Sequence, residues 1–160
     1  IQSYDDYRLW DRAIALQREY IKLYPDTPNL LGRKVRIGIF LYDLKEYNRA
    51  IEHLKDLKPL ADAETEPEIQ YWIARSYADG GETEKSIIEY LKVRYLSKPT
   101  KLPWGVTSLY EAGQGYKKLG NYAKAIELFE EVVRERGATD NMGRKANQTI
   151  MEIKQIQQKS

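Results

Sequence analysis

Apolar and polar positions follow the period of amphipathic helices along this chain, and the pattern returns at a nearly constant interval. Each return carries a small residue followed by isoleucine: Ala13-Ile14, Ala50-Ile51, Ser86-Ile87 and Ala125-Ile126. The small residues are 37, 36 and 39 positions apart (50−13, 86−50 and 125−86). An interval of this size predicts a solenoid of stacked structural repeats.

Each repeat is predicted to contain two helices joined by a tight turn. In the last complete repeat, apolar and small residues recur every three or four positions from Leu109 to Tyr116, as on one face of a helix. Gly120 suits the left-handed residue that ends a helix, and Asn121 suits the N-cap of the next. A second helix follows, with Phe129 on its apolar side. Proline-containing segments separate the repeats at 25–29, 59–65 and 97–103.

These breaks divide one 160-residue domain into units. We predict a truncated leading unit at 1–29, in which residues 1–8 are the tail of a first helix, and complete units at 30–65, 66–103 and 104–139. A capping helix is expected at 140–158, with Asp140 as its N-cap and Ile150, Ile153 and Ile156 on its apolar side. Because the chain begins at Ile1, without a signal peptide, we expect it to be a piece of a longer protein.

The repeat resembles the tetratricopeptide repeat family. The likeness is greatest at 106–139, and the residues at the family's consensus spacing are Gly113, Tyr116, Gly120, Tyr122, Ala125 and Phe129. Pro25 matches the proline that closes a unit, so the resemblance covers about 1–139. It implies an all-α, right-handed superhelical solenoid of antiparallel helix pairs, completed here by the capping helix. It also implies a non-catalytic scaffold that binds other proteins.

The units are longer than is usual in that family, and the additional residues lie in the loops between them. Such loops are similar to those of bacterial periplasmic and outer-membrane-associated members, among them the outer-membrane assembly lipoprotein and the Tol–Pal-associated proteins. This likeness implies a location in the bacterial periplasm or at the outer membrane, with a cytoplasmic location as the alternative. The longest loop, 97–104, ends in Trp104, which is expected to fasten it to the preceding unit.

Composition narrows the possible functions. The 26 basic and 24 acidic side chains give a net charge of +2, too balanced to indicate nucleic acid or an anionic membrane as the partner. No apolar run approaches the roughly 20 residues that span a bilayer, so direct membrane insertion is not expected. The absence of cysteine excludes disulfides, thiolate zinc sites and cysteine nucleophiles.

Residues that could support catalysis are sparse. His53 is the only histidine and is expected to be a solvated surface residue, without a second histidine for a metal or a serine motif for a triad. The glycines between Gly113 and Gly120 do not form a dinucleotide-binding or P-loop motif. The repeat accounts for those two glycines but leaves Gly115 unexplained. We therefore predict no enzymatic activity, no cofactor and no metal.

The resemblance assigns the partner-binding surface to the first helix of each pair. The residues that it places on the inner surface and that suit a peptide are Tyr42, Tyr71, Arg75, Tyr110, Gln114 and Lys117. Aromatic rings provide contact area, and long polar side chains bond to backbone carbonyls. The alternative is that several of these rings pack against the neighbouring unit. Binding of an acidic chaperone C-terminus is not expected, because the clamp positions hold Val35, Ile39, Trp72, Thr107 and Glu111.

Two functional hypotheses remain. The first is a protein-interaction scaffold that binds a peptide or protein segment in the concave groove of the superhelix. The alternative is a structural, self-associating module of a larger bacterial envelope assembly, because the incomplete first unit leaves an apolar helix end uncovered. In that case the chain could form a homo-oligomer.

Overall fold

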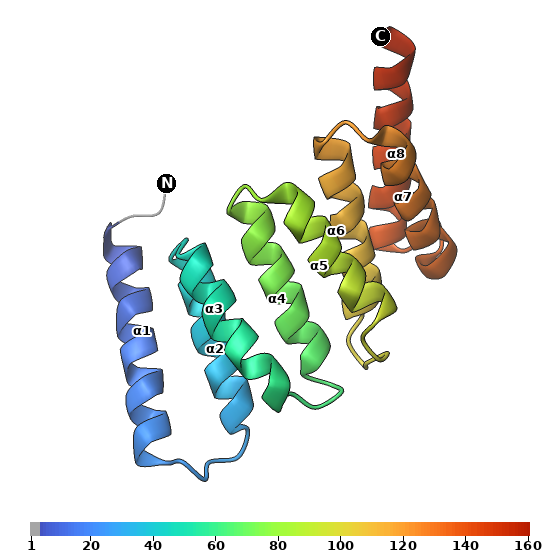
Figure 1. The fold of residues 1–160 in the computed structure, drawn as a ribbon. Coiled ribbons are helices and arrows are strands. Elements are labelled where there is room, and N and C mark those ends of the chain that lie inside the picture. The colour runs from blue at the N-terminus through green and yellow to red at the C-terminus, as the bar shows by residue number, and fades with distance from the viewer. Residues whose placement is uncertain (1–3) are drawn as a thin grey trace.

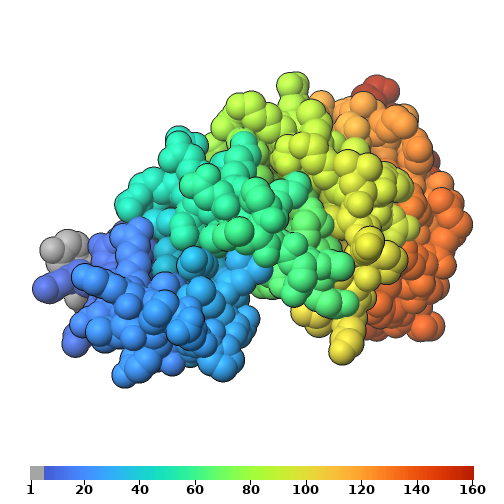
Figure 2. Space-filling model, turned by 60° about the horizontal axis from the view of Figure 1, so that its bottom comes forward, coloured from blue at the N-terminus to red at the C-terminus, as the bar shows by residue number. Residues whose placement is uncertain are grey.

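The computed structural model describes residues 4–160, which form eight α-helices, a short 3₁₀ helix and no strand. The helices are α1 (Tyr4–Leu23), α2 (Leu30–Asp43), α3 (Tyr47–Leu57), η1 (Lys58–Leu60), α4 (Glu66–Asp79), α5 (Thr83–Tyr95), α6 (Trp104–Lys118), α7 (Tyr122–Arg136) and α8 (Asn141–Lys159). Each α-helix packs against the next one along the chain, and the array runs from α1 at one end to α8 at the other (Figure 1). The space-filling view shows the same order, with the N-terminal segment in blue and the C-terminal segment in orange and red (Figure 2).

The helix pairs follow the predicted repeat. Pairs α2–α3, α4–α5 and α6–α7 lie within residues 30–65, 66–103 and 104–139. At the N-terminal end, the expected break between the tail of a first helix and a second helix is absent. Tyr4–Leu23 is one continuous helix, and residues 1–3 of that predicted tail lie outside the described part of the chain.

The turn inside each pair has the same backbone conformation. The residue five positions before the repeated small residue has a positive φ in all three pairs, with values of 62° at Lys45, 87° at Gly81 and 75° at Gly120. Asn121 caps the following helix, as predicted, by accepting a hydrogen bond from Lys124 N at 3.3 Å. Only Lys45 has a side chain at this turn position, and a side chain is unfavourable in the left-handed region.

Close helix packing explains the small residues. Ala50 and Ala125 are fully buried, and the buried Ser86 hydroxyl donates to Thr83 O at 2.7 Å. A Cβ on Gly113 would lie 2.9 Å from Phe129 Cε1 on α7, within the same pair. The glycine that the sequence left unexplained, Gly115, has the same role between pairs.

At Gly115, a Cβ would lie 2.6 Å from Ile87 Cγ1 on α5. Helices α5 and α6 can approach one another this closely because glycine has no Cβ to keep them apart. The glycine therefore sets the distance between neighbouring units, and no ligand is needed to account for it.

The last helix, α8, caps the array, but one of the three isoleucines predicted on its apolar side is not buried. Asp140 is its N-cap, as predicted, and its side chain accepts hydrogen bonds from Met142 N at 2.9 Å and Gly143 N at 3.4 Å. Ile153 is fully buried against the preceding units, but Ile156 is 42% exposed, because α8 extends beyond the surface that α7 provides. Among residues 4–160, no helix has both the length and the apolar character to cross a bilayer.

Candidate functional site

The first helices of the pairs form a continuous layer. Beyond contacts with its neighbours in sequence, α4 contacts both α2 and α6. In a superhelix of helix pairs, the helices that approach one another in this way line the inner surface. All six predicted binding residues lie on this inner layer: Tyr42 on α2, Tyr71 and Arg75 on α4, and Tyr110, Gln114 and Lys117 on α6.

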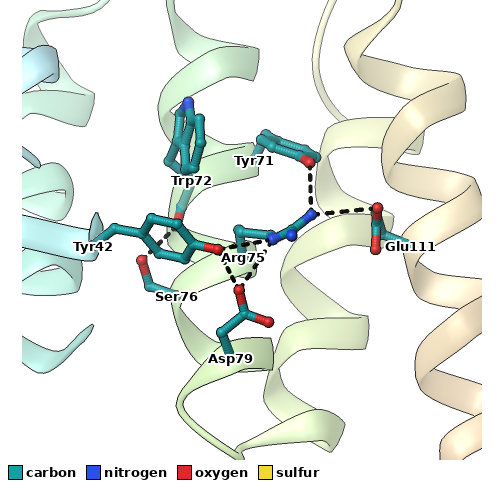
Figure 3. Close-up of polar contacts among 7 residues, drawn as sticks. All are labelled: Tyr42, Tyr71, Trp72, Arg75, Ser76, Asp79 and Glu111. Carbon is teal, nitrogen blue, oxygen red and sulfur yellow. Dashed lines mark hydrogen bonds and ion pairs between the residues drawn. The ribbon is translucent and has the colours of Figure 1, made fainter. Parts of the chain in front are cut away.

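Arg75 joins the three helices of the layer through one polar network (Figure 3). Its Nε donates to Tyr42 Oη on α2 and to Asp79 Oδ2 on α4, both at 3.2 Å. Its Nη1 donates to Tyr71 Oη and to Glu111 Oε1 on α6, both at 3.5 Å. Tyr42 Oη donates in turn to Asp79 Oδ2. We call these five residues the Arg75 network.

Burial and charge shift the proton affinities in this network. Burial, together with the hydrogen bond to Asp79, raises the pKa of Tyr42 to about 12. Burial also raises the pKa of Glu111 above its ordinary value, against the attraction of Arg75. The pKa of Arg75 is lowered by burial, but the contacts with Tyr42, Tyr71 and Glu111 raise it overall. The guanidinium therefore stays charged at neutral pH and is held by several acceptors at once.

Tyr71 packs between units and offers little surface to a partner. It is 8% exposed, and its ring centroid lies 5.6 Å from that of Trp72, 5.7 Å from Tyr90 and 5.1 Å from Trp104. The Tyr71 ring therefore packs against the neighbouring unit, the alternative given above for these rings. Its hydroxyl accepts a hydrogen bond within the Arg75 network. The contact with Trp104 also shows how the loop 97–104 is fastened to the preceding unit.

The remaining three predicted residues continue the layer toward the C-terminal end. Gln114 Nε2 donates to Tyr110 Oη at 2.9 Å, and the Tyr110 ring lies edge-on to Phe129, with centroids 5.3 Å apart. Lys117 Nζ forms an ion pair with Glu152 Oε2 on α8 at 3.3 Å. All three predicted residues are half-buried, so each combines a packing role with a surface that solvent reaches.

Both signs of charge reach solvent along the inner layer. The side chains of Arg75 and Asp79 are 35% and 40% exposed, and those of Lys117 and Glu152 are 29% and 46% exposed. Arg75 Nη2 makes no hydrogen bond to a described residue, although Nε and Nη1 are engaged. The layer therefore presents alternating donors and acceptors between aromatic rings, which suits a polypeptide segment better than a concentrated anion.

Two acidic residues of this surface, Asp79 and Glu152, were not predicted from the sequence. Asp79 follows Arg75 by four positions, a spacing that favours an ion pair on one helix face and could have identified it. Glu152 lies in the capping helix, outside the repeat, so the repeat gave no register for placing it beside Lys117. The sequence placed Glu111 only among the positions that do not suit an acidic C-terminus, and it gave no sign of the hydrogen bond from Arg75.

The structure corrects the prediction for His53. This residue is half-buried on α3, with Nε2 2.7 Å from Lys34 O on α2, because its ring packs beside Gly38 rather than facing solvent. The contact links the two helices of one pair. Among residues 4–160, no group of three or more His, Asp or Glu side chains has an arrangement that could hold a metal ion.

Comparisons with known proteins agree with this architecture. The family model described as Tetratricopeptide repeat matches residues 106–136. TPR-like repeats of a Podosopora anserina protein assigned as a kinesin light chain are 16% identical, with a TM-score of 0.69 over 97% of this chain and 86% of that chain. A variant of those repeats is also 16% identical, with a TM-score of 0.64 over 97% of this chain and 91% of that chain.

MamA, known from a crystal structure, is 19% identical in sequence to this chain, with a TM-score of 0.59 over 100% of this chain and 99% of that chain. At these identities the solved structures establish the fold alone. No curated protein sequence matches this chain.

Proposed function

Because the chain folds as a solenoid of tetratricopeptide-like repeats, we propose that it is a non-catalytic scaffold that binds a peptide or protein segment along the inner layer of α2, α4 and α6. Repeats of this kind are generally protein-interaction scaffolds, and such a function depends on the surface rather than on the fold. The observation that carries the proposal is the Arg75 network, which aligns polar and aromatic groups from three helices on one surface.

The network holds its groups in place before any partner arrives. Arg75 is fixed by Tyr42 and Asp79 on one side and by Glu111 on the other, so little side-chain freedom is lost when Nη2 meets a backbone carbonyl. Asp79 keeps an exposed carboxylate that accepts a backbone or side-chain donor. An elongated segment that crosses the layer can therefore find hydrogen-bond partners for both the N–H and the C=O groups of its backbone.

Selection from random peptides tests this proposal, because it does not require the natural partner to be identified. A display library of random 16-residue peptides is selected on the whole chain, and the affinities of the enriched peptides are measured by titration calorimetry. We expect Lys117→Glu to lower the affinity for these peptides by about 10-fold or more, because it reverses one charge of the inner layer. Lys124→Glu is the matched control, because Lys124 also pairs with a glutamate but lies exposed on the outer helix α7.

Arg75→Gln provides a second variant, whose shorter side chain keeps donors but cannot span the network. Equal affinities in wild type, Lys117→Glu and Arg75→Gln would contradict the proposal, as would a selection that enriches no peptide at all. Tyr71→Ala is not used, because Tyr71 belongs to the core and its loss would disturb folding.

A further inference from the structure

The Arg75 network holds more negative than positive charge. The single guanidinium of Arg75 is paired with two carboxylates, Asp79 Oδ2 at 3.2 Å and Glu111 Oε1 at 3.5 Å. Further along the inner layer, the ion pair of Lys117 with Glu152 joins one charge of each sign. One negative charge of the Arg75 network is therefore left without a positive partner in the network.

Each of the two carboxylates keeps one oxygen for a partner. Asp79 Oδ1 and Glu111 Oε2 form no hydrogen bond to a described residue, and the two side chains are 40% and 27% exposed. Figure 3 shows them at different sides of the Arg75 guanidinium, Asp79 on α4 and Glu111 on α6. A group that bonds to both must therefore present donors in more than one direction.

Arg75 compensates the charge of Glu111 incompletely. Burial raises the pKa of Glu111 above its ordinary value, although the charge of Arg75 acts in the opposite direction. The distance of 3.5 Å between Arg75 Nη1 and Glu111 Oε1 is also long for a hydrogen bond. A second cation beside Glu111 would lower the cost of keeping this carboxylate charged in a partly buried position.

A buried hydroxyl within the electrostatic reach of Glu111 also lacks a partner. Tyr90, on α5, is 1% exposed, and its hydroxyl forms no hydrogen bond with a described residue. Its ring centroid lies 5.7 Å from that of Tyr71, and burial together with the negative charge of Glu111 raises the pKa of Tyr90. Because an unpaired buried hydroxyl is unfavourable, the polar groups around Glu111 are not all matched within the chain itself.

We propose that Asp79 and Glu111 bind an arginine side chain of the partner segment, an inference that rests on the function proposed above. A guanidinium adds the one positive charge that balances the network, and its N–H donors point in several directions from a flat group. These donors can reach Asp79 Oδ1 and Glu111 Oε2 together, whereas the ammonium of lysine is a compact point charge. The half-buried ring of Tyr42, whose hydroxyl donates to Asp79, lies beside this site and can stack against the guanidinium.

The charge of Arg75 does not exclude a second guanidinium, because two carboxylates already surround it. With the partner's arginine in place, two positive charges face two negative charges, and Arg75 Nη2 still meets a backbone carbonyl of the same segment. A glutamate of the partner in that position would instead bring a third carboxylate to a single guanidinium. The site therefore discriminates against acidic side chains by repulsion as well as favouring arginine by attraction.

Matched peptides test the arginine site. The random peptides that are enriched on the whole chain are expected to share an arginine. The tightest of them is synthesised with that arginine and with three replacements: citrulline, which keeps the shape without the charge, lysine, and glutamate. Titration calorimetry should show an affinity about 10-fold or more lower for the citrulline peptide, a smaller loss for the lysine peptide and the largest loss for the glutamate peptide.

Amide variants of the chain test whether the two carboxylates hold that arginine. Asp79→Asn and Glu111→Gln remove one charge each but keep an acceptor for Arg75. Each should reduce the preference for the arginine peptide over the citrulline peptide, and the double variant should bring the two affinities to within about 2-fold of one another. Glu130→Gln, at an exposed position on the outer helix α7, is the matched control and should leave the preference unchanged.

The two proposals can fail separately. Enriched peptides that share no arginine would overturn the arginine site, and so would a preference for arginine that persists in the double variant. Either result leaves the proposed scaffold function intact, provided that Lys117→Glu still weakens binding. A selection that enriches no peptide would contradict both.

Discussion

Arg75 and Glu111 lie 36 residues apart, one repeat, and their Nη1 and Oε1 atoms are 3.5 Å apart on adjacent first helices. Two further ion pairs join neighbouring units in the same way, Arg94 with Glu131 at 2.7 Å and Lys117 with Glu152 at 3.3 Å. The two residues of each pair are 35 to 37 positions apart in the sequence. Polar contacts as well as apolar packing therefore repeat with the period of the solenoid, and they fix one unit against the next.

Removal of the central guanidinium should loosen the inner layer. We expect Arg75→Met to lower the free energy of unfolding by about 1–2 kcal/mol, because Glu111 and Asp79 then lack their charged partner in a half-buried position. Arg49→Met, which breaks an exposed pair with Glu46 within one helix turn, should cost less than about 0.5 kcal/mol. Urea unfolding followed by circular dichroism measures both. Equal losses in the two variants would contradict a special role for Arg75.

Glu111 should make stability depend on pH with a definite sign. Since burial raises its pKa in the folded chain, its contribution to stability is complete below the pKa of the unfolded chain and is lost as the pH rises through the folded value. From about pH 4 to about pH 7, the wild type should therefore lose stability relative to Glu111→Gln. Unfolding free energies of both proteins across this range give the comparison. A wild type that gains on the variant would mean that attraction to Arg75 exceeds the cost of burial.

The turn at Lys45 offers a gain in stability. Lys45 has φ 62° where the equivalent residues are Gly81 and Gly120. Lys45→Gly should stabilise the chain by about 0.5–1 kcal/mol, because the left-handed conformation no longer strains a Cβ. Gly120→Ala should destabilise it by about 1 kcal/mol for the same reason. Thermal unfolding of the two variants measures both effects. A loss of stability in Lys45→Gly would show that the lysine side chain outweighs its backbone cost.

Gly115 should be intolerant of a side chain. Its Cβ would lie 2.6 Å from Ile87 Cγ1, so Gly115→Ala should cost about 1–3 kcal/mol by overpacking the contact between α5 and α6. Ile87→Ala removes the obstructing atom and costs its own buried volume. The double variant should therefore lose less than the sum of the two single losses, a coupling that a double-mutant cycle in urea measures. Strict additivity would show that the helices move apart at no cost.

The repeat made much of the fold predictable from the sequence. Regular spacing of Ala50, Ser86 and Ala125 located three helix pairs, since only small residues fit where the helices touch. Gly120 and Asn121 marked a turn because their backbone and capping preferences are local properties. The expected gap near Tyr7 and Arg8 was wrong. No helix-breaking residue lies there, so Tyr4–Leu23 continues as one helix.

Contacts between units were harder to predict. Periodicity placed Tyr71 and Arg75 on the inner layer, but it could not separate a ring that packs between helices from one that faces a partner. His53 was placed outward for the same reason, since a helical projection does not include the neighbouring helix that supplies Lys34 O. These distinctions depend on how far adjacent units rotate and approach, which glycines such as Gly115 decide through contacts with distant residues.

The central claim is that a polypeptide segment binds along the inner layer, and NMR mapping tests it most directly. Amide resonances of the ¹⁵N-labelled 18.7 kDa chain are followed while a selected peptide is added. The largest shifts should fall on α2, α4 and α6 around Tyr42, Arg75 and Gln114, and Lys117→Glu should diminish them. Shifts confined to the outer helices α3, α5 and α7 would contradict the assignment of the inner layer as the binding surface.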